Sequence, residues 1–197
     1  MTSTGLGDSG EAFAGALLVA TPLIDEPTFR RAVVLLLEHS DGGSLGVVLN
    51  EVSQLSTGVV LPGWEDVLFD RAGVGGPVQG DAGVAVARLT PVALGGPPQG
   101  VQLFSPPWAV LDLSGDPDEV AGSVADGQLF LGYAGWEAGQ LANELRSGSW
   151  WVVDSEPDDL ALGRFGDDRD EPWRQVVGRQ RTDLRYLRTY PDDPSWN

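Results

Sequence analysis

The chain has 197 residues, of which 42% are hydrophobic and seven are tryptophan, a composition typical of a globular protein with one sizeable core. It contains no cysteine and no lysine, which excludes disulfides, thiolate metal sites, cysteine nucleophiles and lysine Schiff bases. The formal net charge of −17 repels phosphate backbones, so direct binding to nucleic acid is disfavoured.

The N-terminal residues 1–12 are mostly small and polar, and we expect them to form a disordered leader. A single domain is expected over residues 13–190, followed by an extended, proline-bounded tail over 191–197. The longest apolar runs fall short of the roughly 20 residues needed to cross a bilayer. The N-terminus also lacks the basic segment of a signal peptide, so the sequence predicts a cytoplasmic protein without a membrane anchor.

Three strands are predicted at the start of the domain, over residues 13–20, 29–39 and 44–50. Each is a short aliphatic or β-branched run, and prolines or glycines bound the runs. Ser40-Asp41-Gly42-Gly43 lies between the second and the third run. Because Asp-Gly and Gly-Gly tolerate positive φ, this segment predicts a tight hairpin.

Residues 42–46 also fit the G-x-S-x-G pattern of a serine hydrolase, with Ser44 as the nucleophile. That nucleophile needs a strand before it and a helix after it, whereas here a strand follows. The α/β-hydrolases place their histidine after the serine, but the only histidine of this chain, His39, precedes Ser44. We therefore interpret the motif as a hairpin turn and not as a catalytic centre.

Short strands separated by glycine and proline are predicted over residues 73–80, 83–89, 101–104 and 108–113. The glycines of residues 73–80 lack the spacing of a dinucleotide-binding loop. Residues 116–127 predict a helix, because Asp116 suits the N-cap and Pro117 the first helical position, and Gly127 is suited to end it.

Residues 128–135 predict a central strand that leads into a helix over 136–147. An apolar stripe at helical spacing supports that helix: Ala138, Leu141, Ala142 and Leu145. Trp136 and Gln140 then fall on its opposite, polar face. Gly139 in mid-helix suggests close approach of another backbone or of a ligand, and helix-to-sheet packing is the favoured interpretation. The N-terminus of this helix could accept an anion, but Glu137 in the first turn can satisfy the helix dipole, so a bound phosphate is not favoured.

Two acidic clusters, residues 154–159 and 166–172, offer oxygen atoms of the kind that bind Ca²⁺ or Mg²⁺. Neither cluster has the spacing of an EF-hand loop, and blocks of like charge usually face water. We expect solvated loops here, and no metal site.

One basic segment follows, with five of the twelve arginines between residues 174 and 188. Two interpretations are open: contact with RNA, DNA or an acidic partner, or docking on the protein's own acidic surface. The charge balance of the chain favours docking. The arginines are Arg174, Arg179, Arg181, Arg185 and Arg188.

Residues 15–50, 75–78 and 131–150 resemble the YqgE/AlgH family of bacterial proteins. The third block is the most specific, because Gly132, Tyr133, Gly135, Trp136 and Gly139 all fit the family pattern. The likeness extends over most of residues 13–180. It implies an α+β fold with a mixed, partly barrel-like β-sheet surrounded by helices. The family is labelled a transcriptional regulator by association with one member, and the resemblance implies no common enzymatic reaction.

We expect a non-enzymatic regulatory or protein-interaction role, with no catalytic residue and no cofactor. A protein partner is the expected ligand. The alternative is a small-ligand-binding protein or an enzyme that uses the His39 region. The candidate binding residues are His39, Asn50, Tyr133, Trp136 and Gln140.

Overall fold

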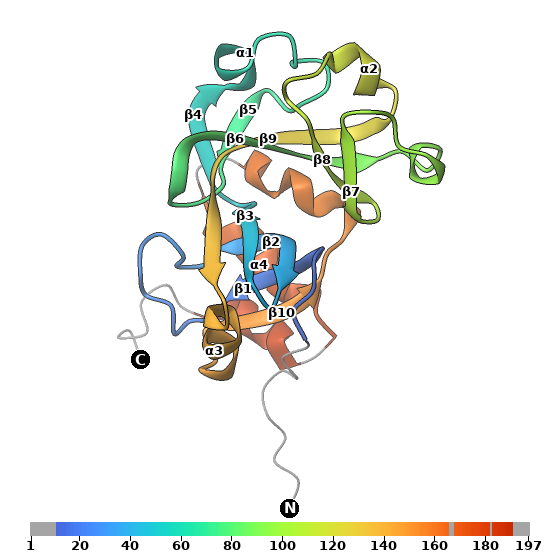
Figure 1. The fold of residues 1–197 in the computed structure, drawn as a ribbon. Helices are drawn as coiled ribbons and strands as arrows, with labels where there is room; N and C mark the ends of the chain where they lie inside the picture. Colours follow the sequence, from blue (N-terminus) through green and yellow to red (C-terminus); the bar gives the residue numbers. More distant parts are fainter. Residues whose placement is uncertain (1–10, 166–167, 182, 191–197) are drawn as a thin grey trace, which may run out of the picture.

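The computed structural model describes residues 11–165, 168–181 and 183–190 (Figure 1). Most of the expected leader and the whole expected tail, residues 191–197, lie outside the described residues. The described strands are β1 (Ala16–Ala20), β2 (Val33–Ser40), β3 (Gly43–Val48), β4 (Val52–Ser56), β5 (Arg71–Val74), β6 (Val78–Leu89), β7 (Val101–Ser105), β8 (Trp108–Leu111), β9 (Val124–Glu137) and β10 (Trp150–Asp154). The α-helices are α1 (Thr57–Val60), α2 (Pro117–Ala121), α3 (Gln140–Arg146) and α4 (Asp170–Gly178), and the 3-10 helices are η1 (Ala93–Gly95), η2 (Pro157–Phe165) and η3 (Asp183–Thr189).

One curled sheet organises the chain, and its strand order is β10-β1-β2-β3-β9-β6-β8-β7, with β4 and β5 attached beside β9. The pairing is antiparallel except between β5 and β9, which run parallel. The sheet is therefore mixed, and Figure 1 shows it curling around η2 with helices packed about it. The predicted α+β class with a partly barrel-like sheet is confirmed.

The long strand β9 joins the two parts of the sheet. Its first part pairs with β6, and its last residues, Ala134 to Glu137, pair with β3. The strand bends at Gly132, where φ is +71°. A Cβ atom at this position would lie 2.6 Å from the carbonyl oxygen of Gly76 and 2.8 Å from that of Val78, so close backbone approach requires glycine here.

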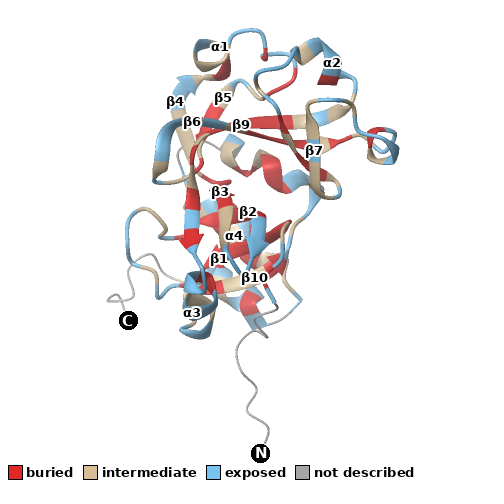
Figure 2. Cartoon of the chain, viewed as in Figure 1, coloured by how far each residue is buried: buried red, intermediate tan, exposed pale blue. Residues whose placement is uncertain are grey.

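The core combines aliphatic and aromatic side chains from the strands and from the helices packed on them (Figure 2). Every residue of β1 is buried, because the strand lies between β10 and β2 with both faces covered. Helix α4 packs one apolar side against the core through Trp173, Val176 and Val177, which follow helical spacing. None of the described helices is both long and apolar enough to cross a membrane.

Several sequence predictions are confirmed. The hairpin joins β2 to β3 through residues 40–43, and β5 and β6 enclose the glycine-rich residues 75–77 without a following helix. Helix α2 begins as predicted, since the Asp116 side chain accepts a hydrogen bond from the amide of Asp118. It ends at Ala121, well before Gly127. Ala12, which the sequence placed in the leader, is buried in the core.

Candidate functional site

The tip of the β2–β3 hairpin lies beside the end of β9. Gly43 pairs with Glu137 across the sheet, and Ser44 pairs with His39 on one side and Trp136 on the other. Residues 38–42 of the hairpin and residues 137–140, from the end of β9 to the start of α3, are all exposed. These two segments form one continuous surface, which we call the hairpin surface.

The predicted helix over 136–147 is wrong at its start, because β9 continues through Glu137. Pairing with β3 extends the strand, and Gly139 then adopts a left-handed turn with φ of +74° before α3 begins at Gln140. No atom lies within 4 Å of a Cβ built at Gly139. This glycine is therefore required by the turn and not by close packing. The sequence did not favour an anion at the start of the expected helix, and the amide of Glu137 in fact donates to Oε1 of Gln140.

Trp136 lies in the core and not on a polar helix face, which corrects the sequence prediction. Its side chain belongs to a strand residue that points inward, and only 6% of the residue is exposed. Phe29 and Trp150 enclose the indole, with ring centroids 6.5 and 6.0 Å from that of Trp136. Trp136 therefore supports the hairpin surface from beneath.

Glu144 of α3 connects these aromatic residues to the surface. Its Oε2 accepts hydrogen bonds from the indole nitrogens of Trp136, at 2.9 Å, and Trp150, at 2.7 Å. Its Oε1 accepts a third from Nε2 of Gln140, at 2.9 Å. One carboxylate thus fixes two buried indoles and the exposed Gln140, and it holds α3 against the end of β9.

Replacing Glu144 by leucine is expected to lower the free energy of unfolding by about 2 to 4 kcal/mol, because two largely buried indole N–H groups lose their acceptor. Glu144→Gln keeps one amide oxygen as an acceptor and should lose less. Urea unfolding followed by tryptophan fluorescence measures both values. Glu137→Leu, at an exposed neighbour, is the control, and equal losses for Glu137→Leu and Glu144→Leu would contradict the assigned role.

Asn50 and Tyr133 are not part of the hairpin surface. Asn50 is 3% exposed, and its side-chain amide bonds the backbone of Val33, Arg31 and Arg169. Tyr133 is half-buried beside the bend of β9 and packs against the core. Of the five residues singled out in the sequence, the hairpin surface contains His39 and Gln140.

His39 and Ser44 are in contact, but they do not form the arrangement of a serine hydrolase. His39 Nδ1 lies 2.7 Å from Ser44 Oγ across the two strands of the hairpin. Ser44 is held within the sheet, between β2 and β9, and no helix follows it. The prediction of a hairpin turn in place of a nucleophile elbow is confirmed, and the signal that separated them was the strand pattern after Ser44.

The first acidic cluster is not a solvated loop throughout, which corrects the sequence prediction. Asp159 is 1% exposed and forms an ion pair with Arg179, whose Nη2 lies 2.8 Å from Oδ2. Burial alone would lower the pKa of the Arg179 guanidinium, but the hydrogen bonds that it donates to Asp159 and the charges of Asp159 and Glu156 together raise this pKa above its ordinary value. For Arg179, the predicted docking on the protein's own acidic surface is confirmed.

Within the described ranges, no group of three or more histidine, aspartate or glutamate side chains is placed to hold a metal ion. Residues 166 and 167 of the second acidic cluster lie outside those ranges. Asp170 and Glu171 of the same cluster occupy the first turn of α4, where their negative charges interact favourably with the positive end of the helix dipole.

The sequence is similar to those of several known proteins. A family model described as AlgH-like matches residues 17–185. A UPF0301 protein of Streptomyces avermitilis is 42% identical over 189 residues, covering 94% of this chain and 96% of the relative. A UPF0301 protein of Mycobacterium avium is 39% identical, with 93% and 90% covered.

Two solved structures share the fold. The crystal structure of a protein from Corynebacterium diphtheriae matches with a TM-score of 0.86 at 28% identity, covering 93% of this chain and 95% of that one. The solution structure of the AlgH protein from Pseudomonas aeruginosa matches with a TM-score of 0.61 at 25% identity, covering 95% and 100%.

Proposed function

The chain belongs to the AlgH-like family, a membership that establishes no specific activity. We propose that the protein is a non-catalytic cytoplasmic regulator that binds a protein partner. The single observation that carries the proposal is the hairpin surface. Sheet pairing and the Glu144 hydrogen bonds hold two exposed loops side by side in a fixed geometry. Preorganised loops bind with less loss of conformational entropy than flexible ones.

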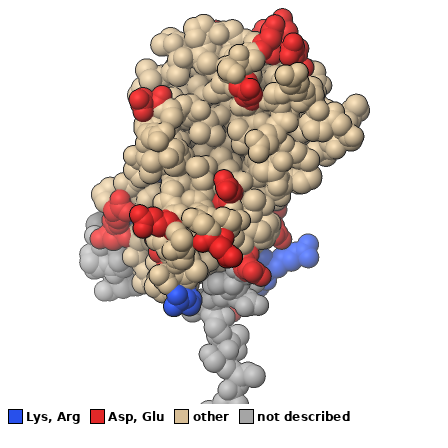
Figure 3. All heavy atoms as spheres, in the orientation of Figure 1, with Lys and Arg blue, Asp and Glu red and all other residues tan. Residues whose placement is uncertain are grey.

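The charge of the hairpin surface indicates the chemistry of the partner. Glu38, Asp41 and Glu137 are exposed on it, and neither of its segments contains an arginine. Figure 3 shows acidic side chains gathered around α3, at the same end of the molecule. Complementary charge speeds association and discriminates among partners, so a basic protein segment suits this surface and a nucleic acid does not.

His39 and Gln140 supply polar contacts on the same surface, in this proposal. His39 exposes its ring beside Ser44, while Gln140 is oriented by its bonds to the amide of Glu137 and to Glu144. Trp136 and Asn50 act as positioning residues, because both are buried. Tyr133 contributes by packing beneath the bend of β9.

The proposal is tested by removing the charge of the hairpin surface without changing its shape. A triple variant, Glu38→Gln, Asp41→Asn and Glu137→Gln, is compared with the wild-type protein in affinity capture from native lysate of the source cells, quantified by mass spectrometry. We expect a protein retained by the wild type to be lost, because each exposed charge pair removed lowers the association rate.

The matched control removes three exposed carboxylates elsewhere: Asp66→Asn, Asp81→Asn and Glu119→Gln. It changes the net charge equally and should retain the partner. Identical sets of captured proteins for the wild type and both variants would refute the proposed surface.

A further inference from the structure

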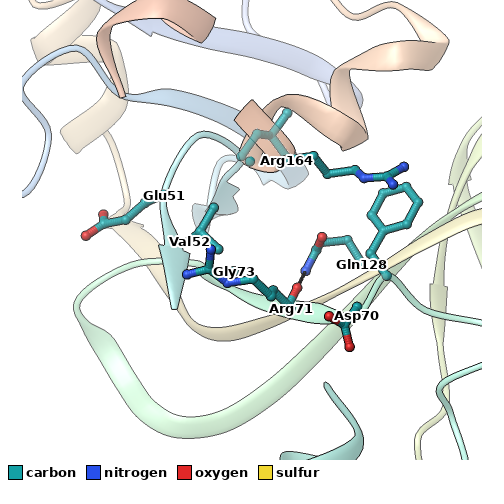
Figure 4. A pocket seen from close by; sticks show the side chains of 10 residues that line it. Glu51, Val52, Asp70, Arg71, Gly73, Gln128 and Arg164 are labelled. Carbon is teal, nitrogen blue, oxygen red and sulfur yellow. Dashed lines mark hydrogen bonds between the residues drawn. The ribbon is translucent and has the colours of Figure 1, made fainter. Parts of the chain in front are cut away.

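A cavity of about 220 Å³ lies between the start of β4, the start of β5 and the end of η2 (Figure 4). It shares no residue with the hairpin surface. Its lining combines apolar and polar side chains from segments far apart in the chain. They include Leu49, Val52, Phe69, Arg71, Gln128 and Arg164.

Arg164 and Phe69 form one wall of the cavity. The guanidinium carbon of Arg164 lies 4.7 Å from the centroid of the Phe69 ring, so the two planar groups contact each other. Arg164 is exposed, and among the described residues its guanidinium contacts the ring of Phe69. A guanidinium held by a ring keeps its N–H groups available for a carboxylate or phosphate oxygen.

Gln128 supplies a fixed acceptor in the lining of the cavity. The residue is 6% exposed, and its Nε2 donates both protons to the backbone, to the carbonyl of Arg71 at 2.7 Å and to that of Leu129 at 2.8 Å. These two bonds set the orientation of the amide. Figure 4 shows Oε1 on the side that faces Arg164. A largely buried acceptor of this kind suits an O–H or N–H group of a ligand.

The charges around the cavity favour an anion, although the whole chain is strongly acidic. Glu51 forms an ion pair with Arg169, and Figure 4 shows its carboxylate directed away from the cavity. The Asp70 carboxylate also points away from Arg164. Arg71 bonds the carbonyl of Ser53 through Nε and Nη2, which places a second positive charge near the lining.

We propose that this cavity binds a small, flat organic carboxylate that also carries an O–H donor. The carboxylate pairs with the guanidinium of Arg164, the donor bonds Oε1 of Gln128, and the apolar body packs between Phe69, Leu49 and Val52. A phosphate group also pairs with guanidinium, but the apolar lining and the limited volume favour the smaller carboxylate.

The first test compares three matched probes on the unmodified protein. These are 3-hydroxybenzoate, which carries both groups, benzoate, which lacks the donor, and 3-hydroxybenzyl alcohol, which lacks the charge. Titrations are followed by the ¹H–¹⁵N NMR signals of the full chain, including the Gln128 side-chain amide. We expect 3-hydroxybenzoate to bind about tenfold more tightly than either control, since each control lacks one of the two hydrogen-bonding groups that the site recognises.

Arg164→Gln at the exposed end of the site should weaken 3-hydroxybenzoate about tenfold and leave 3-hydroxybenzyl alcohol unchanged. Arg30→Gln, at another exposed arginine, is the control and should change neither. Equal affinity of the three probes, equal effects of the two variants, or shifts confined to residues outside the cavity would each overturn the proposal. Because the hairpin surface is separate, capture of its partner by Arg164→Gln should remain at the wild-type level.

Discussion

Arg179→Met is expected to lower the free energy of unfolding by about 3 kcal/mol, because it leaves the Asp159 carboxylate buried without its counter-charge. Asp159 is 1% exposed, and besides Arg179 its carboxylate accepts a hydrogen bond from the backbone amide of Glu156, at 2.6 Å. One neutral hydrogen bond does not replace the solvation that a buried carboxylate has lost. The pair also connects η2 to the end of α4, so the loss should loosen the packing of both against the sheet.

Equilibrium urea unfolding of the full chain measures this loss, with Arg185→Met as the matched control. Arg185 lies on η3, is exposed and contacts Tyr186, so its replacement changes the charge equally but should alter stability by less than about 0.5 kcal/mol. The double variant Arg179→Met and Asp159→Leu should be more stable than the single one, because it removes the uncompensated carboxylate. A double variant less stable than Arg179→Met would contradict the explanation.

The β2–β3 hairpin was predictable from sequence because local chemistry determines it. Asp41 and Gly42 allow the turn, and the aliphatic runs on either side need no distant partner to be recognised as strands. The same holds for the start of α2, where Asp116 caps the helix from two residues away. Such features depend on contacts within a few residues.

The end of β9 was not predictable in this way, because two patterns overlap there. Ala138, Leu141 and Leu145 have helical spacing, whereas burial alternates along the strand, with Ala134 and Trp136 inside. Pairing with β3, which lies about ninety residues earlier in the chain, extends the strand as far as Glu137. The alternation of burial appears only in the folded chain, whereas the helical stripe is visible in the sequence.

The Asp159–Arg179 pair and the cavity depend on tertiary structure alone. Asp159 is one of several acids in a run that would ordinarily face water, and nothing local marks it as buried. Likewise, Arg164, Phe69 and Gln128 meet only because η2 enters the curl of the sheet. The sequence supplied the charges of these groups but not their neighbours.

Asn50→Leu is expected to lower the free energy of unfolding by about 3 to 5 kcal/mol, because three backbone groups, in two buried hydrogen bonds and one partly buried one, lose their partner at once. Oδ1 of Asn50 accepts from the amide of Val33 at 2.8 Å, and Nδ2 donates to the carbonyls of Arg31, at 2.8 Å, and Arg169, at 2.9 Å. These bonds join the start of β2, the end of β3 and the residue that precedes α4. Leucine has a similar size, so the loss reflects hydrogen bonding and not a cavity.

Asn50→Asp separates the two halves of this role. It keeps an acceptor for Val33, but its second oxygen faces two carbonyl oxygens, so we expect a loss as large as that of Asn50→Leu. Asn143→Leu, on the exposed side of α3, is the control and should change stability by less than about 0.5 kcal/mol. Hydrogen exchange adds a local measurement, since the Val33 amide should exchange faster in Asn50→Leu than in Asn50→Asp. If Asn50→Leu is as stable as the wild type, apolar packing holds β2, β3 and α4 together and the Asn50 hydrogen bonds contribute nothing to stability.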